Sequence, residues 1–182
     1  MRHVPADAVT VEVVRAALNA AAERMRITMI KTAYNHIISE SLDFGCAIFD
    51  PDVQMIAQGI GLAVFQGHLG FPIEAAIADR GIAAFREGAV FMHNDPYTGN
   101  GNHLNDVAMF APVYWEGRLT GFVSVKAHWS DVGGPVPSSM QVGSTDFRQE
   151  GLRFRSVRLF DRGTLNDEVM RIIAGNIRTE GR

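Results

Sequence analysis

Two runs of alternating residues joined by a short turn signal limit the fold more than any other feature of the sequence. Apolar residues alternate with small or polar ones over 107–115 and again over 119–128, and Glu116-Gly117 lies between the two runs. Alternation with a period of two is typical of β-strands, and a two-residue turn ending in glycine joins neighbouring antiparallel strands. The sequence therefore predicts a β-hairpin over 107–128.

Helical patterns and further strand patterns surround this hairpin. Apolar residues at three- and four-residue spacing predict a long opening helix over 9–38. Asp50-Pro51-Asp52 is a turn sequence that predicts another hairpin, with strands over 44–49 and 53–58. The other expected elements are a helix over 71–85, a strand over 151–160 and a helix over 166–177. The predicted fold class is α+β: a long N-terminal helix, β-hairpins forming a mostly antiparallel sheet, and further helices packed on it.

The composition indicates one globular domain over residues 1–182. A share of 47% hydrophobic and 20% charged residues suffices for a buried core. The net charge of −3, with acidic and basic residues mixed along the chain, speaks against a nucleic acid partner. No apolar run has the length of a secretory signal or a membrane span, so we expect a cytoplasmic protein without a membrane partner. The single cysteine, Cys46, fits a reducing compartment and is expected to pack in the core.

The last predicted helix has an apolar side that the rest of the sequence does little to cover. Its apolar residues recur at helical spacing shortly before Arg182: Val169, Ile172, Ile173 and Ile177. Exposed apolar surface of this kind marks a missing domain or a partner interface. We therefore expect the chain to be the N-terminal fragment of a longer subunit, and to have no activity alone.

The polar segment before the central hairpin contains candidate metal ligands. His103 and Asp106 have the His-x-x-Asp spacing that lets a loop turn both side chains to one side. They would offer one imidazole nitrogen and one carboxylate oxygen, a mixed set that suits zinc, manganese or ferrous iron.

The register of the hairpin brings His128 to the same place. A two-residue turn sets His128 diagonal to Asp106, and a three-residue turn sets it directly opposite Asp106. Directly opposed side chains are about 5 Å apart and diagonal ones about 7 Å. In either register His128 can bind the same metal ion as His103 and Asp106, so three donors converge.

The other residues of reactive types have simpler explanations. The remaining histidines are expected to be ordinary surface or hydrogen-bonded residues: His3, His36, His68 and His93. Among them, His68 lies in the glycine-rich turn Gln66-Gly67-His68-Leu69-Gly70 and could also line a pocket. The sequence has no phosphate-binding loop, no dinucleotide fingerprint and no Gly-x-Ser-x-Gly elbow. Nucleotide handling must therefore lie elsewhere, and covalent acyl-enzyme chemistry is not expected.

Seven segments follow one another along the chain: Ser41-Leu42-Asp43-Phe44, Gln66-Gly67-His68-Leu69-Gly70, Asn94-Asp95-Pro96-Tyr97, His103-Leu104-Asn105-Asp106, Lys126-Ala127-His128-Trp129-Ser130-Asp131-Val132-Gly133-Gly134, Gln149-Glu150-Gly151-Leu152-Arg153 and Asn176-Ile177-Arg178. In this order they resemble the hydantoinase B/oxoprolinase family, which includes N-methylhydantoinase and caprolactamase subunits and the acetone carboxylase α-subunit. Each segment alone is weak evidence, but seven in the right order are specific, and they cover nearly the whole chain.

The resemblance implies one divalent metal, zinc or manganese, held by two histidines and two aspartates. This set corresponds to His103, Asp106 and His128, with Asp43 as the best match for the fourth ligand. Asp95 and Asp131 are the rivals for that fourth place. We expect Asp95 to cap the Asn-Asp-Pro turn and Asp131 to orient His128 from outside the ligand set, because metal-bound imidazoles usually need such a partner.

The resemblance also implies a partner and a reaction. Family partners are hydantoinase A-type subunits that bind ATP, so we expect a hetero-oligomer with ATP on the partner subunit. The implied reaction is ATP-dependent hydrolysis of a cyclic amide or imide such as hydantoin, 5-oxoproline or a lactam. An acetone carboxylase-type ligase subunit, a mononuclear non-haem iron oxygenase-like enzyme and a non-catalytic scaffold are the alternatives. A carboxylate as the fourth protein ligand would count against the oxygenase, because it leaves fewer open positions on the metal.

Overall fold

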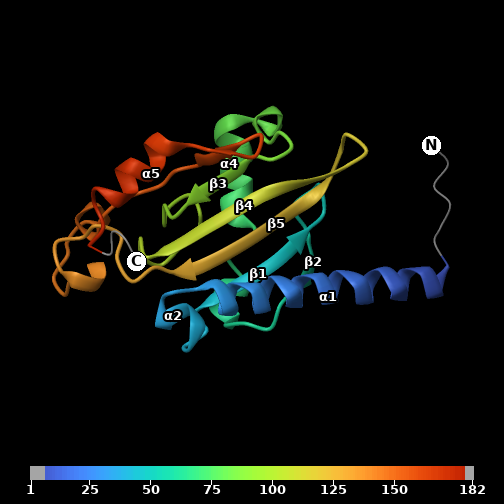
Figure 1. Cartoon of the computed structure of the whole chain (residues 1–182), viewed down its shortest axis with the longest axis horizontal. Coiled ribbons are helices and arrows are strands. Elements are labelled where there is room, and N and C mark those ends of the chain that lie inside the picture. The colour runs from blue at the N-terminus through green and yellow to red at the C-terminus, as the bar shows by residue number, and fades with distance from the viewer. Residues whose placement is uncertain (1–6, 179–182) are drawn as a thin grey trace.

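The structure, a computed structural model that describes residues 7–178, contains a seven-stranded sheet with helices on both faces (Figure 1). The strand order is β2-β1-β5-β4-β3-β6-β7, and all neighbouring strands pair antiparallel. The strands are β1 (Phe44–Phe49), β2 (Met55–Gln58), β3 (Val90–His93), β4 (Asp106–Trp115), β5 (Arg118–His128), β6 (Val157–Asp161) and β7 (Thr164–Leu165). The α-helices are α1 (Ala8–Thr32), α2 (His36–Ser39), α3 (Ala63–Gln66), α4 (Phe71–Arg80) and α5 (Asp167–Ala174). The predicted fold class is therefore confirmed.

The hairpin of β4 and β5 forms the middle of the sheet and uses both registers that the sequence allows. Trp115 pairs with Arg118 across a two-residue turn, whose residues Glu116 and Gly117 have the positive φ values that such turns require. The register then shifts by one residue between Val113 and Tyr114. Beyond this β-bulge the pairing is that of a three-residue turn, so Asp106 lies directly opposite His128.

Aromatic residues fill the face of the sheet that α4 covers. The buried residues there include Phe49, Phe91, Phe110 and Phe122, which pack with Ile73 of α4. Phe85, which follows a short 3-10 turn (Ile82–Ala84) after α4, contacts Phe91, Phe110 and Phe122 with ring centroids 4.6 to 6.2 Å apart. This cluster is the main core of the described part of the chain.

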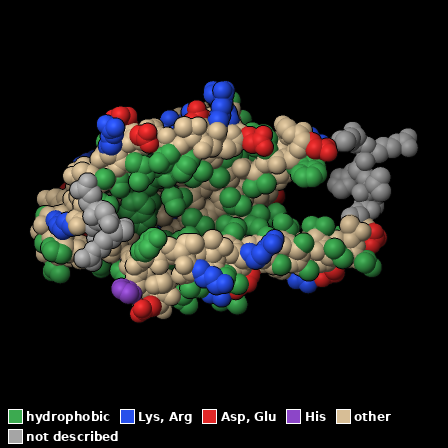
Figure 2. All heavy atoms as spheres, in the orientation of Figure 1, with side chains coloured by type: hydrophobic (Ala, Val, Ile, Leu, Met, Phe, Trp, Pro, Cys, Tyr) green, Lys and Arg blue, Asp and Glu red, His purple; other side chains and the backbone are tan. Residues whose placement is uncertain are grey.

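The opposite face of the sheet is covered in part by α1. Phe44, Cys46 and Ala127 point to this face and pack with Met25 and Met29 of the helix. Cys46 is 1% exposed, and burial raises the pKa of its thiol to about 12, so its predicted place in the core is confirmed. Over β3, β4 and β5 the same face carries a shallow apolar groove of about 210 Å³, lined by Val90, Met109, Ala111, Val123 and Val125 among others. Figure 2 shows hydrophobic side chains gathered between the α1 side and the α5 side of the molecule.

Two predicted helices end earlier than the periodicity suggested. α1 ends at Thr32, because Ala33 is extended and the Asn35 side chain accepts a hydrogen bond from the Ile37 backbone and so caps a separate helix, α2. α4 ends at Arg80, because Gly81 has a φ of 74°. The 9–38 and 71–85 predictions were therefore too long at their C-terminal ends.

The C-terminal part also differs from the predictions. The strand predicted over 151–160 begins only at Val157, and β3 was not assigned from the sequence. The apolar side of α5 is covered, contrary to expectation: Ile173 is buried, and Val169 and Ile177 pack against the same cluster with Val132 and Phe154, although Ile172 is 56% exposed. Within residues 7–178, no helix has the length and hydropathy needed to cross a membrane.

Candidate metal centre

Three candidate ligands lie in one row across neighbouring strands at the end of the sheet. Asp106, the first residue of β4, pairs with His128, the last residue of β5. The His128 backbone N–H donates to the carbonyl of Asp43, which directly precedes β1, at 3.1 Å. The ladder thus continues from Asp43 through His128 to Asp106.

The loop between β3 and β4 adds His103 to this row. His103 Nε2 lies 2.8 Å and His128 Nδ1 lies 3.4 Å from the same oxygen, Oδ1 of Asp106. One ligand atom from each of these three residues lies within 4.8 Å of the others. Two ligands of one ion bonded at ~2.0–2.2 Å lie at most about 4.4 Å apart, so small side-chain movements would let the three donors hold one divalent ion. The structure brings together the three residues that the hairpin register selected.

Asp43 lies at the rim of this group. Its Oδ2 is 4.0 Å from His128 Nδ1, and its side chain is 32% exposed, whereas that of Asp106 is 6% exposed. Its place as a fourth ligand stays a prediction.

Mutual hydrogen bonding controls the charges in the cluster. Burial raises the pKa of Asp106, but hydrogen bonds from His103 and His128 outweigh this effect and lower it to about 2. The hydrogen bond to Asp106 raises the pKa of His103. A buried carboxylate that stays ionised between two imidazoles is a hard negative ligand with nitrogen donors at its side, which suits zinc or manganese.

Asn94 fixes the loop that carries His103. Its side-chain amide donates to the carbonyls of Leu104 at 2.6 Å and Leu152 at 3.0 Å, and its oxygen accepts from the Phe154 backbone at 2.6 Å. Buried hydrogen bonds of this kind hold both ends of a loop in a single geometry. The position of His103 therefore depends on contacts with the segment that precedes β6.

Asp95 has the capping role predicted for it. Its Oδ1 accepts from the Tyr97 backbone at 3.1 Å, and its Oδ2 lies 3.5 Å from Nε of Arg153. This buried carboxylate therefore stabilises the Asn-Asp-Pro turn, and its described contacts are with residues outside the histidine cluster.

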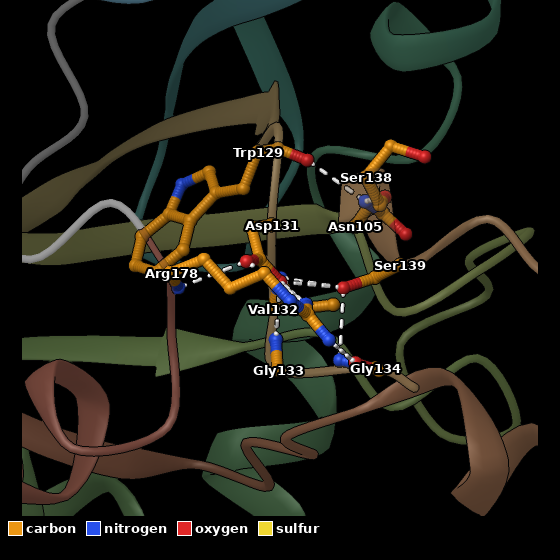
Figure 3. Close-up of polar contacts among 9 residues, drawn as sticks. All are labelled: Asn105, Trp129, Asp131, Val132, Gly133, Gly134, Ser138, Ser139 and Arg178. Atoms are coloured by element: carbon orange, nitrogen blue, oxygen red, sulfur yellow. Dashed lines mark hydrogen bonds and ion pairs between the residues drawn. The ribbon is translucent and has the colours of Figure 1, made fainter. Parts of the chain in front are cut away.

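Asp131 has other partners than His128 (Figure 3). Its oxygens accept hydrogen bonds from Ser139 Oγ at 2.7 Å, from the Gly133 backbone at 2.8 Å and from Arg178 at 2.9 to 3.1 Å. The expected contact with His128 is absent from the described interactions of Asp131, because these donors use both carboxylate oxygens. The structure assigns Asp131 to holding the 131–139 loop and Arg178 together.

The remaining histidines differ in their surroundings. His36 is exposed beside Glu40, and His93 is buried, with hydrogen bonds to Thr98 and to the Ser156 backbone, as their simpler explanations suggest. His3 lies outside the described residues. Burial lowers the pKa of His68, and the Lys126 ammonium lowers it further, whereas the Asp106 carboxylate opposes this change.

Sequence reasoning missed two residues beside the cluster. Glu150 accepts a hydrogen bond from the Leu104 backbone at 3.3 Å and, with His103 and Asn105, lines a cavity of about 220 Å³. Lys126 is 2% exposed; burial lowers its pKa and the Asp106 carboxylate opposes that change. Lys126 could have been found from the sequence, because it lies two residues before His128 in a strand and so shares its face.

Comparison with known proteins identifies the family. The family model described as hydantoinase B/oxoprolinase matches residues 7–182. The chain belongs to the hydantoinase B/oxoprolinase family. It is 35% identical over 178 residues to the B subunit of a putative D-/L-hydantoinase from Pseudomonas sp. (strain NS671), covering 94% of this chain and 30% of that protein.

Solved structures agree with the hydantoinase B/oxoprolinase assignment. The crystal structure of ATP-dependent caprolactamase from Pseudomonas jessenii matches 98% of this chain and 30% of its own, with a TM-score of 0.80 and 29% identity. A nucleotide-free acetone carboxylase matches 93% of this chain and 22% of its own, with a TM-score of 0.85; at 22% identity this shows a shared fold. The chain spans 29% to 31% of the length of the first curated relatives that it matches.

Proposed function

We propose that this chain is the metal-binding part of an enzyme subunit that opens cyclic amides or imides in an ATP-dependent complex. One observation carries the proposal: His103, Asp106 and His128 converge on one point, in a chain of the hydantoinase B/oxoprolinase family. In this proposal Asp43 is the fourth ligand and the metal is zinc or manganese.

The arrangement suits hydrolysis of an amide. A divalent ion held by these residues would lower the pKa of a bound water towards ~7, so that hydroxide is available near neutral pH. Asp106 stays ionised beside the two imidazoles and keeps both of them turned toward the same point. Asn94 keeps the loop of His103 closed over the sheet, so the donors are already in place before a ligand binds.

The same proposal assigns ATP to a partner. Two related proteins are named as parts of larger enzymes, one as the B subunit of a putative hydantoinase and one as the beta subunit of caprolactamase. The caprolactamase structure is described as ATP-dependent, whereas the sequence of this chain has no phosphate-binding loop. A hydantoinase A-type subunit would therefore bind ATP and activate the amide oxygen by phosphorylation, while this chain supplies the hydroxide. The buried, unpaired Cys46 fits a cytoplasmic location for such a complex.

Metal analysis with matched variants tests the site. The purified protein should contain about one equivalent of zinc or manganese. Asp106→Asn should remove most of it, whereas Asp95→Asn, a change at a similarly buried aspartate in the loop that precedes β4, should retain it. Equal metal contents in wild type and Asp106→Asn would contradict the proposal.

Turnover tests the reaction. The full-length subunit, with and without an ATP-binding hydantoinase A-type partner, would be incubated with hydantoin, 5-oxoproline, caprolactam, or acetone with bicarbonate. We expect ATP-dependent ring opening of one of the three cyclic substrates, and only when the partner is present. Carboxylation of acetone without ring opening would favour the acetone carboxylase-type alternative instead.

A further inference from the structure

Lys126 lies one row deeper in the sheet than the metal cluster and on the same face. It pairs with Ala108 of β4 and Gly45 of β1, just as His128 pairs with Asp106 and bonds to the backbone of Asp43. Side chains two residues apart in a strand share a face and are about 7 Å apart along it. The side chain of Lys126 therefore forms part of the floor beneath the three donors.

Small residues and a glycine-rich loop enclose the amine. Gly45 and Ala108 on either side leave room for the lysine stem, and α3 closes over Gly45, where an added Cβ would lie 2.9 Å from Phe65 Cβ. At the other end, Nζ lies 3.4 Å from the position that a Cβ of Gly101 would occupy. The loop that carries His103 thus lies directly over the Lys126 amine.

The Lys126 side chain is almost wholly buried, but its amine is not among the fully enclosed polar atoms, and it has no partner among the residues that the structure describes. Lys126 is 2% exposed, yet no hydrogen bond or ion pair from it to residues 7–178 is present. The Asp106 carboxylate attracts the Lys126 ammonium, but its oxygen already contacts the imidazoles of His103 and His128. An ammonium that is largely removed from water and has no partner is unfavourable, and a metal ion bound to Asp106 would weaken the attraction between Asp106 and Lys126 further. A metal-loaded site of this kind favours an anionic ligand that reaches both cations.

We propose that Lys126 binds a negatively charged oxygen of the molecule that is bound at the metal centre. The inference rests on the proposed function, which supplies two sources of such an oxygen. Ring opening adds the hydroxyl of water to the carbonyl carbon and its proton to the ring nitrogen as the carbon–nitrogen bond breaks, so the product presents a carboxylate. Phosphorylation of the amide oxygen by ATP on the partner would present a phosphoryl group instead.

Anion binding to the cobalt-loaded, full-length protein separates these possibilities. Cobalt(II) replaces zinc in such sites and reports the ligand sphere through its visible absorption. Acetate and inorganic phosphate are titrated separately into wild type, Lys126→Met and Lys126→Arg. Ser124→Ala serves as the control, because Ser124 lies on the same strand face, is buried and has no hydrogen-bond partner for its hydroxyl in the described structure.

Lys126→Met should bind cobalt as wild type does and lose affinity for one of the anions by roughly tenfold or more, the factor for losing a charge-assisted hydrogen bond. Lys126→Arg should lose less, and Ser124→Ala nothing. Loss in the acetate titration assigns the oxygen to a carboxylate, and loss in the phosphate titration assigns it to a phosphoryl group.

Other outcomes overturn the inference. Unchanged affinity for both anions in Lys126→Met would show that the amine does not contact the ligand. Loss of cobalt from both Lys126 variants would show that the lysine supports the ligand residues instead. Absence of cobalt binding in wild type would overturn the metal site itself, and a wild type that binds cobalt but neither anion would overturn only the role of Lys126.

Discussion

Replacing Asp131 with asparagine removes the negative charge that holds the 131–139 loop against Arg178. Burial raises the pKa of Asp131, but hydrogen bonds from Gly133, Arg178 and Ser139 lower it from 3.8 to about 2. At about 1.36 kcal/mol per pKa unit, this difference corresponds to about 2 kcal/mol of folding stability. The carboxylate is 4% exposed but the Arg178 side chain is 42% exposed, so solvent screens part of this interaction and about 2 kcal/mol is an upper value.

The pH dependence of this effect follows from the sign of the pKa change. A carboxylate whose pKa is lowered on folding contributes fully above its unfolded value, near 3.8, and loses the contribution as the pH falls through about 2. Asp131→Asn should therefore be less stable by up to about 2 kcal/mol at about pH 7, and the difference from wild type should shrink between about pH 4 and pH 2.

Urea denaturation of wild type and Asp131→Asn over this pH range measures the effect. Asp146→Asn is the control, because Asp146 forms its described ion pair with Arg148 at an exposed site, where such pairs contribute little. A destabilisation that is absent at neutral pH, or that does not change between about pH 4 and pH 2, would refute the reasoning.

Metal content of the same variant tests the place of Asp131. Since its described contacts do not include His128, Asp131→Asn should change metal affinity by less than about tenfold. A loss of roughly 10–100-fold would instead support the role of orienting His128.

Three further changes test the site and the core. Asp43→Ala should lower metal content, measured by elemental analysis, because its Oδ2 lies 4.0 Å from His128 Nδ1; equal content would transfer the fourth position to water. Phe85→Ala should lower the free energy of unfolding by about 3–5 kcal/mol, because its fully buried ring contacts three other rings; a loss below about 1 kcal/mol would contradict the described packing. Gly121→Ala should destabilise the protein in the same assay, because an added Cβ would collide with the carbonyl of Phe49, whereas Gly59→Ala, whose added Cβ would approach Ala22 at 3.1 Å, should have a smaller effect.

Local patterns sufficed to predict the hairpin and the three central donors. The turn at Glu116-Gly117 and the alternation on both sides fix which residues oppose each other to within one position. The choice between the two registers depends on a β-bulge, which the sequence does not mark and which the structure places beside Val113. Either register keeps His128 near Asp106, so the prediction of the three donors did not depend on this choice.

Contacts between distant segments could not be predicted in this way. The pairing of β1 with β5, which sets Asp43 beside His128, joins residues more than 70 positions apart, and only the family resemblance pointed to Asp43. Asp131 was expected beside His128 because metal-bound imidazoles usually need such a partner, but its donors are Gly133, Ser139 and Arg178, the last of them 47 positions away. Long-range partners of polar side chains depend on tertiary packing, for which a local pattern carries no signal.

The alternation of residues in β5 that supplies side chains to the core also supplies polar side chains to the site. Along one face of β5, Phe122 lies in the aromatic core, Ser124 follows in the next row, then Lys126, and finally His128 at the end of the sheet. The polar end of this series is therefore fixed by the rigid pairing of β1, β4 and β5, and loops only cover it. Two loops cover it: Asn94 holds the loop that carries His103, and Asp131 holds the 131–139 loop. A substitution in either loop should therefore affect access to the site more than the distances between the donor atoms. A substitution that breaks the β1–β5 pairing should affect both.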